Sequence, residues 1–151
     1  MSGVEAIGII AAAGQFIEQT IKIARLVQAI RNKARDAPAE TQQWVEELET
    51  LKDIATKVQG TAALQTPQVE KILRRCDTHS RNLLAVLESI SYEADASYGE
   101  KTWAAINGVA REGKIKDFFG DLEREKSSLT AYIATANLSV PTAALSDTPY
   151  R

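Results

Sequence analysis

Two side chains could do nucleophilic or acid–base chemistry, because the chain has a single cysteine and a single histidine. Cys76 shares helical spacing with Ile72 and Leu83, which predicts a buried thiol that acts as a small hydrophobic group and not as a nucleophile. His79 lies at the edge of the same stripe, where we expect a bond to water or to a neighbouring side chain. We assign neither residue a catalytic role.

The sequence carries no motif for a nucleotide, a metal or a covalent intermediate. Its eight glycines are scattered and form no GxxxxGK[ST] loop, and HExxH, CxxC and GxSxG are absent as well. A lone histidine and a lone cysteine do not supply the usual ligand set of a zinc site. The apolar stripes also lack the inward-facing Glu and ExxH pairs of iron-binding bundles. We therefore expect no enzyme activity, no cofactor, no metal and no small-molecule substrate.

The composition predicts one folded domain. Of 151 residues, 44% are hydrophobic and 25% are charged, which is the balance of a globular protein. The 18 basic and 20 acidic residues give a formal net charge of −2, so no overall basic field attracts a polyanion. Nucleic acid is not an expected partner. The single cysteine fits a reducing, intracellular setting.

Helical periodicity dominates, and alternation of the strand type is rare. The predicted fold is all-α, an up-and-down bundle of four main helices plus a short additional helix. The main helices are expected at about residues 4–35, 39–59, from 67 to about 90, and 114–137. We predict that residues 1–138 form the bundle domain and that 139–151 are a flexible C-terminal tail or linker.

Three local features refine this prediction. Thr66 is expected to cap the third helix, with Pro67 in its first turn. The stretch KTWAAINGVA is expected to form the short helix, followed by a bend from Gly108 to Gly113. The DLEREK run at 121–126 is expected to be a solvated surface with ion pairs one turn apart.

The first helix has an apolar start and a basic continuation. From Val4 to Ile17, only Glu5 and Gln15 carry polar side chains, and we call residues 4–17 the apolar tip. Because Ile7 projects on the side that becomes polar farther along, the tip is apolar nearly all round and is expected to need cover on every side. Most basic residues of this helix follow the tip, and we call residues 22–35 the basic stem.

The apolar tip is not expected to be a signal peptide or a fixed membrane anchor. No basic residue precedes it, and Glu5 lies where a signal peptide has positive charge. Glu18, Lys22 and Arg25 follow too soon for the roughly 20 apolar residues of a transmembrane helix. Two interpretations remain open, namely a core helix and a helix whose burial is conditional.

Two stretches carry a resemblance to a known family. They are the opening MSGVEAIGIIAAAGQFIEQTIKIARLVQAI, and KTWAAINGVAREGKIKDFFGDLEREKSSLTAYIATAN with CDTHSRNLLAVLESI before it. Over residues 1–138 the chain resembles the fungal death-effector domains called HeLo-like, SesA or NACHT-associated N-terminal domains. Such helical bundles are found in fungal NLR-like receptors and in proteins similar to the HET-S incompatibility protein.

The resemblance implies a cell-death-inducing effector domain that acts at the membrane through its N-terminal amphipathic helix. It implies activation by oligomerisation in fungal immunity or heterokaryon incompatibility, with the protein cytoplasmic at rest and at the plasma membrane when activated. The implied partners are anionic membrane lipids, further copies of the chain, and an NLR-like receptor or a related bundle domain. The alternative is a helical protein-interaction module, an adaptor or signalling domain with no direct membrane activity.

The membrane hypothesis assigns three sets of residues. The membrane-inserting residues are Val4, Ile7, Gly8, Ile9, Ile10, Gly14, Phe16 and Ile17. The residues expected to contact lipid headgroups are Lys22, Arg25, Arg31, Lys33 and Arg35, each charge near the surface adding about 1 kcal/mol. The candidates to line a pore or an interface are Glu5 and Glu18, because a carboxylate is costly in lipid.

Overall fold

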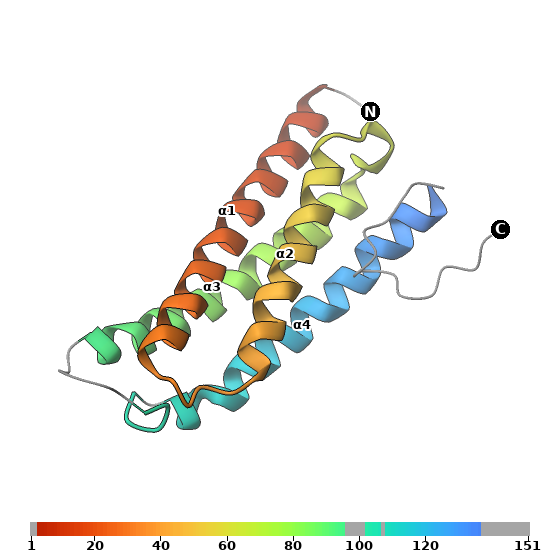
Figure 1. The fold of residues 1–151 in the computed structure, drawn as a ribbon. Helices are drawn as coiled ribbons and strands as arrows, with labels where there is room; N and C mark the ends of the chain where they lie inside the picture. Colours follow the sequence, from red (N-terminus) through yellow and green to blue (C-terminus); the bar gives the residue numbers. More distant parts are fainter. Residues whose placement is uncertain (1–2, 96–101, 107, 137–151) are drawn as a thin grey trace.

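The structure, a computed structural model, describes residues 3–95, 102–106 and 108–136. These residues form helices α1 (Gly3–Lys33), α2 (Glu40–Gln59), α3 (Pro67–Asp95) and α4 (Gly108–Thr135), with a short 3₁₀ helix η1 (Ala62–Leu64). Successive helices run in opposite directions (Figure 1), so the predicted all-α up-and-down bundle is confirmed. A short 3₁₀ helix, η1, accompanies the four main helices, but it lies at residues 62–64 and not at KTWAAINGVA, where the short helix was predicted and where residues 103–106 form a turn. The predicted domain boundary at 138 and the predicted tail at 139–151 lie outside the described residues.

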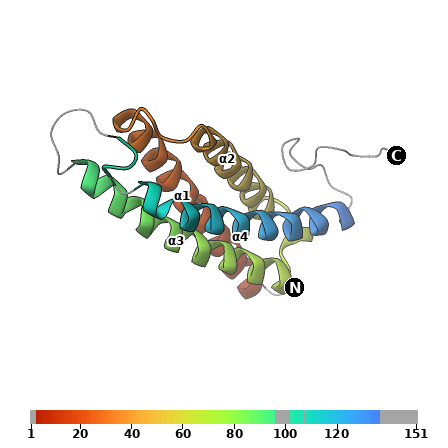
Figure 2. The ribbon, with the colours of Figure 1, turned by 90° about the horizontal axis from the view of Figure 1, so that it is seen from below.

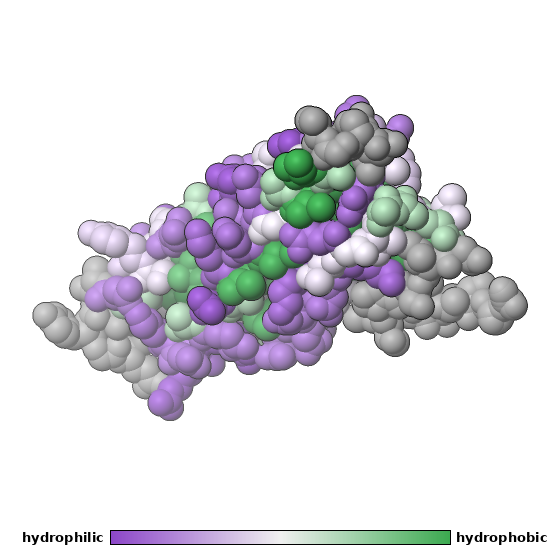
Figure 3. All heavy atoms as spheres, turned by 90° about the horizontal axis from the view of Figure 1, so that it is seen from above, coloured by the Kyte–Doolittle hydropathy of each residue, from purple (hydrophilic) through white to green (hydrophobic). Residues whose placement is uncertain are grey.

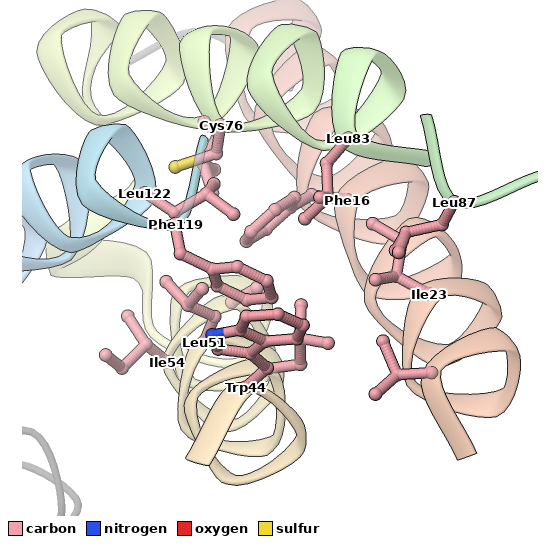
Figure 4. Close-up of a cluster of buried hydrophobic side chains, with 14 of the residues drawn as sticks. Phe16, Ile23, Trp44, Leu51, Ile54, Cys76, Leu83, Leu87, Phe119 and Leu122 are labelled. Carbon is pink, nitrogen blue, oxygen red and sulfur yellow. The ribbon is translucent and has the colours of Figure 1, made fainter. Parts of the chain in front are cut away.

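The helices share one hydrophobic core. α1 makes its main contacts with α2 and α3, and α4 makes its main contacts with α3 (Figure 2). Figure 4 shows side chains from all four helices meeting in the core. Trp44 of α2 stacks on Phe119 of α4, with ring centroids 5.4 Å apart and planes at 14°. Phe16 of α1 is fully buried, and each such side chain adds about 1.5–3 kcal/mol to the free energy of unfolding.

The predicted start of α3 is confirmed in detail. The backbone N–H of Val69 donates to Thr66 Oγ1 at 3.2 Å, which satisfies one of the free amides of the first turn. Pro67 is the first helical residue, where its missing N–H costs no helical hydrogen bond. The cap also fixes where α3 leaves the short η1 connection.

The predicted bend from Gly108 to Gly113 is wrong, because α4 begins at Gly108. Trp103 lies in a turn and not in a helix. Its indole N–H donates to Glu112 Oε1 at 2.9 Å, and its ring packs directly on the backbone of Gly108. A Cβ at residue 108 would lie 2.1 Å from the ring. This contact between the turn and the helix is not visible in the helical periodicity of the sequence.

The prediction that residues 121–126 are a solvated surface is also wrong in part. Lys126 is buried, and its Nζ lies 2.9 Å from Glu123 Oε2 on the same helix and 2.9 Å from Glu47 Oε2 on α2. Burial lowers the pKa of Lys126, but hydrogen bonds to Glu123 and Glu47 outweigh burial, so the pKa is raised overall. Lys126 therefore stays charged and joins α4 to α2.

Candidate functional site

The two residues with reactive side chains, Cys76 and His79, lie on α3 in different environments. Burial, followed by the charge of Glu125, raises the pKa of the Cys76 thiol to about 12, so the thiol is protonated at neutral pH. His79 lies between two carboxylates of α4, with Nδ1 3.7 Å from Asp121 Oδ2 and Nε2 3.5 Å from Glu125 Oε2. Within the part of the chain that the structure describes, no group of three or more side chains could hold a metal ion.

The apolar tip of α1 has one buried face and one open face. Ile9, Ala13 and Phe16 are 0% exposed and belong to the core. In contrast, Ile7 is 69% exposed and Ile10 is 40% exposed. The bundle therefore does not supply the cover on every side that the tip was expected to need, and of the two interpretations left open, complete burial as a core helix does not apply to Ile7 and Ile10. Apolar side chains reach the surface among hydrophilic ones on the face that Figure 3 shows from above.

The other residues of the tip lie along its margins. Gly8, Gly14 and Ile17 are half-buried, whereas Glu18 is exposed at the start of the polar face. The side chains of Val4 and Glu5 lie outside the described part of the structure, so the predicted role of Glu5 has no structural account. The eight residues assigned to membrane insertion thus do not share one environment.

Side chains of α2 and α3 lie on the tip where α1 has glycines. Gln59 Nε2 donates to the backbone oxygen of Ile10 at 3.2 Å. A Cβ at Gly14 would lie 3.3 Å from the same nitrogen. A Cβ at Gly8 would lie 3.6 Å from Glu70 Oε2. The glycine at 14 therefore leaves room for Gln59 at the backbone of α1, whereas a Cβ at residue 8 would meet Glu70 at an ordinary van der Waals distance.

The basic stem divides into two groups of cations. Lys22 and Arg25 are exposed, and neither forms an ion pair or hydrogen bond with any residue described. Arg31 donates to Gln42 Oε1 at 2.6 Å, and Lys33 pairs with Asp95 of α3. Arg35 also has an interaction partner. Of the five predicted headgroup contacts, Lys22 and Arg25 are thus the ones that remain available.

Lys22 and Arg25 flank a shallow groove between α1 and α3. The groove has a volume of about 370 Å³ and is also lined by Leu26, Ala29, Leu84 and Glu88. It places two cations beside apolar side chains, an arrangement that suits an amphiphile with an anionic headgroup.

Comparisons with known proteins add no family. No protein-family model, curated protein or solved structure matches the chain. Among the described residues, no helix combines the length and the hydropathy needed to cross a bilayer. The resemblance to HeLo-like domains stays a prediction.

Helical periodicity could not identify Gln59 and Glu70 as neighbours of the tip. Gln59 is the last residue of α2 and precedes Gly60, so the sequence marks it as a helix end. Its bond to Ile10 joins residues 49 positions apart, and no local spacing indicates such a contact. The sequence does carry one signal of these contacts, the glycines at 8 and 14, since a glycine inside a helix often marks a close approach of another element.

Proposed function

We propose that this bundle is a cell-death effector domain that acts on anionic membranes through α1. It rests in the cytoplasm, is activated by oligomerisation and then engages the plasma membrane. The observation that carries the proposal is the apolar tip, which presents isoleucines to solvent at Ile7 and Ile10 while its opposite face, with Ile9 and Phe16, lies in the core.

When the tip moves from the bundle to lipid, its buried side chains exchange one apolar environment for another. Ile9 and Phe16 lose about 1.5–3 kcal/mol each on exposure to water, and lipid restores most of that loss because it is also apolar. Ile7 and Ile10 are exposed at rest, so they gain free energy on entering lipid. Withdrawal of the tip also exposes the apolar faces of α2 and α3 that pack on it, and this exposure is the cost that the activating trigger must supply.

The length of the tip suggests how it meets the bilayer. Residues 4–17 form a helix about 21 Å long at a rise of about 1.5 Å per residue, which is less than the roughly 30 Å of the hydrocarbon core. An interfacial position, with the apolar faces in the acyl region and the basic stem at the headgroups, agrees with these dimensions. Lys22 and Arg25 then face anionic lipid, and Glu18 stays in the polar region.

Dye release from anionic liposomes tests the proposal. The variant Ile7→Asp changes an exposed side chain near the start of a helix, where a negative charge is favourable, so its melting temperature should match that of the wild type. Its dye release should fall by about tenfold or more, because a carboxylate in lipid costs about 2.5–3.5 kcal/mol at full depth. Val109→Asp is the matched control, since Val109 is 62% exposed on α4.

Deletion of residues 2–17 should also abolish dye release, and it counts only if circular dichroism shows that the other helices stay partly folded, because the deletion removes the buried Ile9 and Phe16. Equal release from Ile7→Asp and the wild type would count against membrane action by the tip. An absence of release from every form, together with capture of a second helical protein that Ile7→Asp prevents, would favour the alternative of a protein-interaction module. Ile9→Asp is unsuitable, because Ile9 is fully buried and the change would unfold the bundle.

A further inference from the structure

We propose that the α2–α3 corner, residues 58–70, is a clasp that holds the apolar tip against the bundle, and that Gln59 is its release point. Gln59 Nε2 donates to the backbone oxygen of Ile10 at 3.2 Å from the end of α2. The Glu70 carboxylate lies against Gly8 from the first turn of α3. The consequence of the clasp for membranes rests on the proposed function, whereas its effect on α1 does not.

The hydrogen bond from Gln59 joins α2 to α1 and is not needed to form α1. In a regular α-helix the carbonyl of residue 10 already accepts the N–H of residue 14. The side chain of Gln59 therefore adds a second donor that ties α2 to α1. Gly14 lies under the same side chain, where a Cβ would be 3.3 Å from its Nε2. The glycine leaves room for Gln59 to reach the backbone.

Hydrogen bonds position both side chains of the clasp, Gln59 at the end of α2 and Glu70 at the start of α3. Gln65 is buried, and its Nε2 donates to the backbone oxygens of Val58 at 3.3 Å and Gln59 at 3.1 Å. These bonds hold the end of α2 in place. On α3, Arg74 donates to Glu70 Oε2 from Nε at 2.9 Å and from Nη2 at 2.5 Å. The two side chains that touch α1 are thus positioned by the corner.

The two ends of α1 are held by contacts of different strength. At the far end Asp36, just past the helix, accepts the N–H of Trp103 at 2.7 Å in a partly buried bond. Lys33 also forms an exposed ion pair with Asp95, which contributes little to stability. These contacts involve charged groups, which strengthen hydrogen bonds. The Gln59 bond is neutral and exposed, so water readily replaces it. The tip is therefore the end of α1 that opens first.

Amide hydrogen exchange tests the clasp directly. Gln59→Met keeps the length of the side chain and its helix propensity but removes the donor. Backbone amides between residues 9 and 17 should exchange about three- to tenfold faster, as expected for the loss of one neutral hydrogen bond. Exchange in α3 and α4 should not change. Dye release from anionic liposomes should become faster by a similar factor.

Gln43→Met is the matched control. Gln43 is exposed on the same helix and lies about 24 Å from Gln59 along the helix axis, so this variant should match the wild type in both measurements. Unchanged exchange at residues 9–17 in Gln59→Met would overturn the clasp. Faster exchange in all helices would also overturn it, since Gln59 would then support the whole bundle. Faster exchange at the tip without dye release from any variant would support the clasp and contradict only the proposed membrane function.

Discussion

At the scale of single residues, the chemistry of this chain is packing and hydrogen bonding. Its thiol is buried, with a pKa raised to about 12, and the side chain of His79 lies between carboxylates of α4. Two polar atoms that matter for the proposed function come from ordinary residues, the Nε2 of Gln59 and the backbone oxygen of Ile10. The proposed function depends at this scale on where exposed apolar side chains lie, and on the charged side chains that have no partner among the described residues.

Gly108 provides a test of the packing of single residues. Gly108→Ala should lower the free energy of unfolding by about 1–3 kcal/mol, because the added Cβ must displace the buried ring of Trp103. Gly113→Ala is the control, since a Cβ there has no neighbour within 4 Å and should stabilise α4 by about 0.5–1 kcal/mol. Urea denaturation of both variants measures the difference. Similar effects of the same sign would show that the contact with Trp103 contributes nothing.

At the scale of helices, periodicity predicts what lies inside but not what crosses between elements. The stripes through Phe16, Trp44 and Leu83 are buried as predicted, because an amphipathic helix buries its apolar face whatever its partner is. The burial of Lys126 was missed, since it depends on Glu47 of a different helix. The start of α4 was missed for the same reason, because a bulky ring from the preceding turn packs on Gly108.

In the candidate site too, the sequence predicts the type of each side chain but not which side chains are exposed or paired. An apolar tip and a basic stem follow from composition alone. Their exposure does not, because Ile7 and Ile9 are chemically identical and two positions apart but lie on opposite faces of α1. Likewise, the sequence does not distinguish Lys22 from Lys33, although Lys33 pairs with Asp95 and Lys22 has no partner among the residues that the structure describes.

Lys22 and Arg25, which have no partner within the described ranges, give a prediction at this scale. The double variant Lys22→Gln and Arg25→Gln should bind vesicles of anionic phospholipid about 20- to 30-fold more weakly, because each charge near the surface is worth about 1 kcal/mol. The control removes two charges from α4 by Lys114→Gln and Arg124→Gln, and should weaken binding only slightly. Vesicle sedimentation at low salt measures both. Equal losses in the two double variants would mean that net charge, and not the stem, controls binding.

At the scale of the whole molecule, the bundle combines a stable core with one helix that is incompletely covered. α1 supplies core side chains along its length, yet its start presents isoleucines to solvent, and its middle presents cations that pair with nothing in the described part of the chain. The contacts at its two ends differ in kind, with an exposed neutral hydrogen bond from Gln59 at the tip and a partly buried bond from the Trp103 N–H to the Asp36 carboxylate past the other end. Release is thus expected to begin at the N-terminal end and to leave α2, α3 and α4 in contact.

The location of residue 7 on a membrane tests the central claim most directly. A fluorescent probe is attached to the cysteine of Ile7→Cys, and to Val109→Cys as the control, since both positions are exposed. The native Cys76 should stay unlabelled because it is buried with a pKa of about 12. With anionic vesicles that contain quencher-labelled lipid, the probe at residue 7 should be quenched strongly and the probe at residue 109 weakly. Equal quenching at the two positions, or none at residue 7, would contradict insertion of the apolar tip.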